Sequence, residues 1–306
     1  MEVLFYMVKT FSELIAAAQQ KDPKKLSVAV AEDIEVLSAV KKAKELNIVE
    51  PILVGNREKI EEISREIGFD LKDIEIVDEK DGQLAARKAT ELVSSGKAHI
   101  LMKGLIDTSI IMKQVLDKEI GLRTEKIISH VAVFDVDTYH KLLFVTDAAM
   151  NISPDLNQKK DIILNAVSLA HSMGIDNPKV AVIAAKEKVS PKMEATIHAK
   201  ELAEMNKNGE ITGCIVDGPF ALDNAISRKA AETKGIKSEV AGDADILLMP
   251  YIEAGNVLYK SLTYFANSKN AGIILGAKAP IVLTSRADSE ETKLYSIVLA
   301  VLLSSK

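Results

Sequence analysis

Three polar side chains of different chemistry follow the apolar stretch 244–249 at helical spacing. The stretch predicts a buried strand that Pro250 ends, and Glu253, Asn256 and Lys260 come after it. Residues three and four positions apart share one face of a helix, so an acid, an amide and an amine are expected to lie together where open α/β sheets bind ligands. The other face is expected to carry Ala254, Leu258, Leu262 and Phe265. The same spacing also fits a solvated face of an ordinary amphipathic helix, and the pattern alone leaves both interpretations open.

A second candidate site follows the apolar strand that ends at residue 284. Asp288 and Glu291 have the spacing of a capping box and predict a helix that begins at Ser289. Ser285 and Arg286 would therefore lie between a strand end and a helix start, where free N–H groups and the helix dipole favour an anion. An arginine can hold two phosphate oxygens at once, and a serine can donate one more hydrogen bond. The alternative is that Arg286 pairs with Asp288 at the surface.

The first half of the chain has a turn of the same kind. Residues 99–102 predict a strand that ends at Lys103 and Gly104, and Asp107 or Thr108 can cap the helix that follows. A glycine at such a turn would let a ligand approach the backbone closely. Lys103 and Gly104 are therefore expected to contribute to substrate binding.

Two further carboxylates are expected just past strands. Asp147 is followed by Asn151 in one loop, and Asp217 is followed by Gly218 in another. Either carboxylate is placed to orient a substrate group or to act as a base. Asp243 and Asp245 also suggest a divalent-metal pair, but we expect these two side chains to point to opposite faces of a strand, so no metal site is expected.

Composition narrows the possible partners and the compartment. The 306 residues carry 39 basic and 44 acidic side chains, mixed along the chain, which gives no reason to expect nucleic acid or an anionic membrane as partner. The single cysteine, Cys214, excludes an internal disulfide and fits a packed thiol in a reducing cytoplasm. No apolar run approaches the ~20 residues of a membrane span, and the N-terminal residues 1–7 do not resemble a secretion signal. Fingerprints for a dinucleotide or for ATP are absent.

Apolar stretches alternate with amphipathic ones, which predicts an α/β fold built on a parallel sheet. Strands are expected at 26–31, 51–54, 74–77, 99–102, 129–135, 142–146, 179–184, 214–216, 246–249, 272–275 and 281–284. Helices are expected at 33–46, 83–94, 109–116, 159–173, 192–207, 224–234, 253–266 and 289–303. The strands at 129–135 and 142–146 are separated by a short connection that suits an antiparallel hairpin and marks a boundary. We therefore predict two α/β domains that share a cleft, a discontinuous one at 1–127 plus 285–306 and a second at 128–284.

Several of these stretches together resemble one enzyme family, the phosphate acetyl/butyryl transferases. The resemblance lies in 242–260, 285–288, Lys103-Gly104, 129–136, 139–151 and 216–227, and it extends from about Leu26 to the C-terminus. It is closest to the butyryl branch, through the Asp-Gly-Pro at 217–219 and the stretch 141–151.

The resemblance implies reversible transfer of a short acyl group between coenzyme A and inorganic phosphate, with no tightly bound cofactor and no metal. It also implies two α/β domains of the isocitrate/isopropylmalate dehydrogenase type, with the active site between them, and a homo-oligomer built from dimers. In the acetyl branch, a serine and an arginine that match Ser285 and Arg286 serve the thiol and the phosphate. The aspartate proposed there as the base falls here at Thr292, beside Glu290 and Glu291, so the identity of the base is open.

The residues fit this chemistry without a protein nucleophile. Arg286 and the helix start would hold phosphate, Arg286, Lys260 or a backbone N–H would stabilise the oxyanion, and coenzyme A supplies the thiol. Within the class, acetyl and branched-chain acyl transfer are the alternatives. Two alternatives come from other classes of protein. One is a metal- and NAD-dependent decarboxylating dehydrogenase on the same fold, and the other is a non-catalytic two-domain binding protein.

Overall fold

The computed structural model describes residues 10–305, which form two compact units. The first unit comprises Ser12–Lys126 and 271–305, and the second comprises 10–11 and Ile127–Asn270. Each unit combines strands with helices, so the predicted α/β class is confirmed. The predicted domain limits stay a prediction, because a compact unit is not shown to fold alone. Residues 1–7, judged above not to be a secretion signal, lie outside the described residues.

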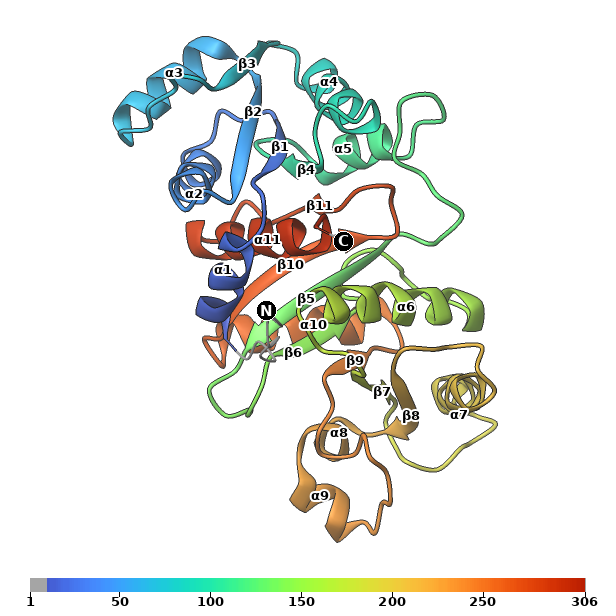
Figure 1. The fold of residues 1–306 in the computed structure, drawn as a ribbon. Coiled ribbons are helices and arrows are strands. Elements are labelled where there is room, and N and C mark those ends of the chain that lie inside the picture. The colour runs from blue at the N-terminus through green and yellow to red at the C-terminus, as the bar shows by residue number, and fades with distance from the viewer. Residues whose placement is uncertain (1–9, 306) are drawn as a thin grey trace, which may run out of the picture. The chain divides into compact units, whose positions relative to one another are not determined.

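The strands of the first unit follow the order β3-β2-β1-β4-β11-β10 (Figure 1). Their bounds are β1 Lys24–Ala29, β2 Val49–Gly55, β3 Glu75–Asp78, β4 Ile100–Lys103, β10 Lys269–Leu275 and β11 Ile281–Val282. β1 to β4 and β11 pair in parallel, but β11 pairs antiparallel with β10. The expected parallel sheet is therefore a mixed one. The short connection from β10 to β11 leaves no room for the helix that a parallel crossover needs.

Six helices accompany these strands: α1 Phe11–Gln19, α2 Ile34–Glu45, α3 Arg57–Glu66, α4 Gly82–Ser94, α5 Thr108–Val115 and α11 Glu290–Leu303. The sequence analysis did not predict α1 and α3. In α3, charged side chains interrupt the apolar periodicity, and the start signal is one residue, Asn56, whose side chain accepts from Lys59 N. α11 packs against α2 and is buried over most of its length, as its nearly continuous apolar sequence requires.

In the second unit the strand order is β5-β6-β9-β7-β8. The bounds are β5 Ser129–Asp135, β6 Leu143–Thr146, β7 Lys179–Ile183, β8 Ile215–Phe220 and β9 Ile246–Leu248. β5 and β6 pair antiparallel, which confirms the predicted hairpin. The pairs β6–β9, β9–β7 and β7–β8 are parallel.

The helices of the second unit are α6 Leu156–Ser172, α7 Glu194–Lys207, α8 Leu222–Ile226, α9 Arg228–Thr233 and α10 Ile252–Tyr264. The single helix predicted at 224–234 is wrong. Ser227 has extended backbone angles and its hydroxyl accepts a hydrogen bond from Ala230 N, so it ends α8 and caps α9. Over residues 10–305, none of the helices in either unit has the length and apolar character that crossing a membrane requires.

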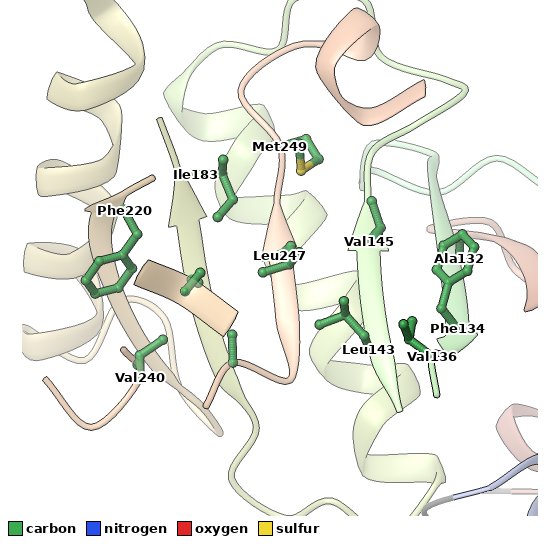
Figure 2. Close-up of a cluster of buried hydrophobic side chains, with 13 residues drawn as sticks. Ala132, Phe134, Val136, Leu143, Val145, Ile183, Phe220, Val240, Leu247 and Met249 are labelled. Atoms are coloured by element: carbon green, nitrogen blue, oxygen red, sulfur yellow. The ribbon is translucent and has the colours of Figure 1, made fainter. Parts of the chain in front are cut away.

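A buried apolar cluster holds the strands of the second unit together (Figure 2). Phe134 and Val145 from the hairpin are fully buried in it, and Leu247 from β9 and Phe220 from β8 belong to the same cluster. Ala254, Leu258 and Leu262 of α10 pack against the cluster, which confirms the predicted apolar face. Phe265 is 92% exposed. It lies past the end of α10, so the helical periodicity used to place it no longer applies.

Asp243 and Asp245 do not face opposite sides, contrary to the prediction. Both precede β9, and both carboxylates contact one ammonium group, Lys141 Nζ, at 3.2 Å and 2.6 Å. Asp243 also pairs with Lys179 Nζ at 2.6 Å and His140 Nε2 at 2.8 Å. The expectation was wrong in its premise, because residues two positions apart in a strand share one face. Cations of the protein itself occupy the positions around these two carboxylates.

We expect Asp243→Asn to destabilise the fold in a pH-dependent way. Burial alone would raise the pKa of Asp243, but hydrogen bonds from Lys179 and His140 and the charge of Lys141 outweigh it and hold the pKa far below its usual range. A carboxyl with a depressed pKa stabilises the fold above its unfolded pKa of about 3.9, and this stabilisation is lost as the pH falls towards the folded pKa. Urea unfolding at pH 7 should show a loss of about 3 kcal/mol, the cost of breaking a largely buried pair.

The loss should shrink when unfolding is repeated near pH 3. The control is Glu204→Gln, because the Lys200–Glu204 pair is more than half exposed on both sides and should contribute less than about 1 kcal/mol. An equal loss at both pH values would contradict the assignment.

Candidate functional site

A small cavity in the first unit brings two predicted motifs together. Its lining consists of Asp33, Val36, Lys103, Gly104, Thr284, Ser285, Arg286 and Lys293. β4 ends at Lys103, and residues 284–286 follow β11. The two strands are parallel neighbours, with Leu101 beside Ile281 and Met102 beside Val282, so their carboxyl ends meet at one edge of the sheet.

Lys103 is a buried cation in this cavity. It is 5% exposed, and Nζ donates to the carbonyl oxygen of Gly104 at 3.1 Å. Burial lowers the pKa of Lys103, and the positive charges of Arg286 and Lys293 lower it further. Three cationic side chains therefore line one cavity, where one carboxylate, Asp33, faces them. An anion in the cavity would relieve the mutual repulsion of the three cations.

Gly104 is required by the protein backbone itself. A Cβ atom at this position would lie 2.1 Å from the carbonyl oxygen of Val30 and 2.7 Å from that of Ala29. Gly104 N donates to the Ala29 oxygen at 2.8 Å. The carbonyls at the end of β1 and just after it thus lie against Gly104 and fix the turn that carries Lys103. The close approach of a ligand to this glycine stays a prediction.

Ser285 and Asp288 close a tight loop before α11. Asp288 Oδ2 accepts from Ser285 N at 2.6 Å. The predicted capping box at Asp288 is wrong by one residue. Ser289 is the N-cap, its hydroxyl accepts from Thr292 N, and the helix begins at Glu290. Asp288 is unable to cap α11 because its carboxylate is used inside the loop.

Arg286 pairs with Asp107, which lies on the other predicted motif. One guanidinium nitrogen is 2.7 Å from Asp107 Oδ1, and the two side chains are 61% and 67% exposed. The alternative partner proposed from the sequence, Asp288, makes no such pair among the described residues. An exposed ion pair of this kind contributes only about 0–1 kcal/mol, so the guanidinium can exchange Asp107 for a bound anion.

Sequence analysis did not select four of the residues that line this cavity, Asp33, Val36, Thr284 and Lys293. Asp33 caps α2 through a bond from Val36 N at 2.9 Å and follows β1, the parallel neighbour of β4. Lys293 is 2% exposed in α11, and its Nζ donates to the Asp288 carbonyl oxygen. Lys293 could have been found in the sequence as a single cation near the start of an otherwise apolar helix. Thr284 offered no signal, because a threonine at the end of an apolar strand is an ordinary strand residue.

The positions considered for the base do not share this cavity. Glu290 and Glu291 line a separate, larger cavity with Glu35 and Lys42. Glu291 Oε1 also accepts from the Tyr295 hydroxyl at 2.6 Å. Thr292 Oγ1 lies 3.3 Å from Ser289 Oγ, within the helix cap. None of these three positions therefore places a carboxylate in the cavity that Ser285 lines.

In the second unit, Asp147 organises the loop that follows β6. The carboxylate is 3% exposed. Oδ1 accepts from Ala149 N and Met150 N, at 2.8 Å and 3.0 Å. Oδ2 accepts from His130 N at 3.2 Å and from Asn151 Nδ2 at 2.6 Å. A carboxylate with four protein donors is suited to positioning the loop, and a direct role of Asp147 or Asn151 on substrate stays a prediction.

α10 is attached to the same loop. Asn256 Nδ2 donates to Ala148 O at 3.3 Å, and a Cβ atom on Gly255 would lie 2.2 Å from Asp147 O. Glu253 is exposed in the first turn of the helix. Lys260 Nζ lies over the rings of Tyr259 and Tyr264, 5.0 Å and 5.8 Å from their centroids. The structure thus joins Asn256 to the Asp147 loop, leaves Glu253 exposed in the first turn, and places Lys260 over aromatic rings about one turn after Asn256.

Asp217 and Gly218 lie inside β8 rather than past its end, contrary to the prediction. The strand continues to Phe220, and Asp217 pairs in register with Ala181 of β7. Asp217 Oδ1 accepts from Gly218 N at 2.8 Å. The strand was expected only at 214–216, but it continues through Pro219, because β8 is the last strand in the order, where a proline is tolerated. Among residues 10–305, no side-chain hydrogen bond joins Asp217 to the Asp147 loop.

Cys214 behaves as a packed thiol. It is 7% exposed, and burial raises the pKa of its thiol to about 11. The thiolate needed for nucleophilic attack is therefore scarce at neutral pH.

The chain is similar to proteins of one kind over nearly its whole length. A family model described as phosphate acetyl/butaryl transferase matches residues 10–87 and 79–301. A phosphate butyryltransferase from Clostridium acetobutylicum is 54% identical over 297 residues, 97% of this chain and 99% of that protein. A phosphate acetyltransferase from Thermotoga maritima is 48% identical, over 95% of this chain and 98% of that protein. A branched-chain phosphotransacylase from Enterococcus faecalis V583 has a crystal structure that matches with a TM-score of 0.81 at 35% identity, over 92% of this chain and 99% of that one.

Proposed function

Because the chain belongs to the phosphate acetyl/butyryl transferase family, we propose that it transfers a butanoyl group reversibly between coenzyme A and inorganic phosphate. In this reaction, butanoyl-CoA and phosphate give butanoyl phosphate and free coenzyme A. The observation that carries the proposal for this chain's own chemistry is the cavity that Lys103, Arg286 and Lys293 line together with Ser285.

The three cations suit the phosphate. Inorganic phosphate carries between one and two negative charges near neutral pH, and Arg286 offers a planar pair of N–H donors that matches two of its oxygens. Lys103 and Lys293 would add charge from buried positions, where water screens it little. The phosphate would take the place of Asp107 on the guanidinium.

Ser285 suits the thiol side of the reaction. Its hydroxyl lies in the loop between β11 and α11, next to Arg286, and we assign it a hydrogen bond to the coenzyme A sulfur. Phosphate attacks the thioester carbonyl, Arg286 or a backbone N–H stabilises the tetrahedral oxyanion, and the thiolate leaves. Holding both substrates side by side supplies much of the acceleration, and the packed Cys214 fits direct attack without a covalent enzyme intermediate. We assign no side chain as the base, because Thr292 replaces the aspartate of the acetyl branch.

We assign the second unit a part in the same reaction. Glu253, Asn256 and Lys260 would contact substrate, with Asp147 and Asn151 holding the loop to which α10 is attached. Asp217 and Gly218 stay in the proposal as substrate-binding residues on β8. The same proposal has three further parts. The two domains have the dehydrogenase-type arrangement with one active site between them, and the protein is an oligomer built from dimers. It uses coenzyme A and phosphate without a bound cofactor.

The test measures release of free thiol from acyl-CoA as a function of phosphate concentration. We expect strictly phosphate-dependent release, insensitive to EDTA, with kcat/KM highest for butanoyl-CoA along the series acetyl, propanoyl, butanoyl and branched-chain acyl-CoA. A missing methylene changes selectivity by only about 1–3 kcal/mol, so activity on neighbouring chain lengths is expected. A maximum at acetyl-CoA or at a branched chain would move the assignment within the family. NADH production or an absence of phosphate-dependent thiol release would contradict it.

A further inference from the structure

The hydroxyl of Thr284 is an unpaired polar group at the cation-lined cavity. Thr284 follows β11, is 3% exposed and precedes Ser285 directly. Its Oγ1 atom is buried and has no hydrogen-bond partner among the described residues. Buried hydroxyls nearly always have a partner in a native structure, so an unpaired one at a binding cavity calls for a ligand.

The chemistry around Thr284 selects the kind of ligand. Lys103, Arg286 and Lys293 line the same cavity and are donors only, so they cannot accept the hydroxyl proton. Ser285 Oγ already accepts from Ala287 N at 3.3 Å. Asp33 and Gly104 belong to the same lining, but no acceptor of the described residues lies within hydrogen-bond distance of Thr284 Oγ1, so the hydroxyl is available to an acceptor from outside the chain. An oxygen of a phosphoryl group is an acceptor and also carries the negative charge that the three cations favour.

We infer that Thr284 is a further substrate-binding residue, whose hydroxyl donates a hydrogen bond to the phosphoryl group of inorganic phosphate or of the acyl phosphate. This inference rests on the proposed function. It assigns the phosphoryl group, rather than the coenzyme A thiol, to the threonine. Arg286 and the two lysines supply charge, and Thr284 supplies a short, directed donor from the end of a strand.

The test is Thr284→Val, which replaces the hydroxyl with a methyl group of similar shape. Hydrogen bonds to charged groups are the stronger ones, so the KM for phosphate and its Kd by calorimetry should both rise about 10- to 100-fold. The KM for butanoyl-CoA should stay within about twofold. Thr284→Ser keeps the hydroxyl and should keep phosphate affinity within a few-fold of the wild type.

Thermal unfolding without phosphate separates binding from a structural role. Removing an unpaired buried hydroxyl should leave the Tm of Thr284→Val equal to or above that of the wild type. Thr90→Val is the matched control, because its buried hydroxyl donates to Ala86 O at 2.8 Å. The Tm of Thr90→Val should be equal to or below that of the wild type, and its phosphate affinity should be unchanged.

The inference fails if Thr284→Val binds phosphate as tightly as the wild type, or if only its butanoyl-CoA affinity falls. A lower Tm without phosphate, with unchanged phosphate affinity, would make Thr284 a structural residue. Calorimetry reports phosphate binding without turnover, so its outcome is distinct from that of the proposed function. If the wild type binds phosphate more tightly than Thr284→Val but releases no thiol, then the site stands and the transferase assignment fails.

Discussion

Replacing Arg286 with alanine is expected to reduce kcat/KM for phosphate by about 10²–10³, because the variant loses the main donor for phosphate and for the oxyanion. Steady-state kinetics should show a higher KM for phosphate and a lower kcat together. The fold should survive, since the guanidinium is 61% exposed and its pair with Asp107 contributes little stability.

Two neighbouring variants make the Arg286 result specific. Arg286→Lys keeps the charge but loses the planar pair of donors, so it should recover only part of the lost kcat/KM. Asp107→Asn removes the carboxylate that holds the guanidinium in the absence of ligand, and it should leave phosphate affinity unchanged or higher. Wild-type kinetics in Arg286→Ala would remove this residue from the mechanism.

Gly255→Ala is the second substitution for which we expect a large effect. The new Cβ atom would lie 2.2 Å from Asp147 O and 3.0 Å from Ala148 Cα, which are backbone atoms and not the ends of flexible side chains. α10 must then move away from the Asp147 loop. Overpacking of this kind costs about 1–3 kcal/mol, even though alanine is intrinsically the better helix residue. Displacing Asn256 and Glu253 should lower kcat/KM about 10- to 100-fold if they contact substrate as proposed.

Gly82→Ala is the matched control for Gly255→Ala. Gly82 is also a helical glycine, at the start of α4, but the nearest atoms to its added Cβ are at 3.9 Å. Urea unfolding should find this control within about 0.5 kcal/mol of the wild type or slightly more stable. Equal stability and activity for both variants would show that α10 does not depend on close contact at Gly255.

The sequence predicted where each part of the site lies along the chain, but it did not predict that these parts line one cavity. Both Lys103 and Ser285-Arg286 were placed at strand ends from an apolar run followed by a polar turn, and the structure has them there. The pairing of β4 with β11 is what puts them at one cavity. These strands are far apart in the chain, and local periodicity carries no information about which strands become neighbours.

The missed features share one physical cause, which is dependence on contacts distant in sequence. Gly255 weakens a helix when judged locally, and only the carbonyl of Asp147 explains it. Thr284 and Lys293 resemble parts of the core until the cavity is seen. The contact of Lys141 with both Asp243 and Asp245 likewise joins residues that are distant in the chain. The resemblance of 139–151 and 285–288 to one family carried the chemistry that spacing alone left open.

The most direct test of the phosphate site is a crystal structure of the protein with inorganic phosphate and coenzyme A. The phosphate is predicted to lie within hydrogen-bond distance of the Arg286 guanidinium and the Thr284 hydroxyl, with Arg286 released from Asp107 and the coenzyme A sulfur near Ser285. Phosphate bound elsewhere, with Arg286 still paired to Asp107, would contradict the account.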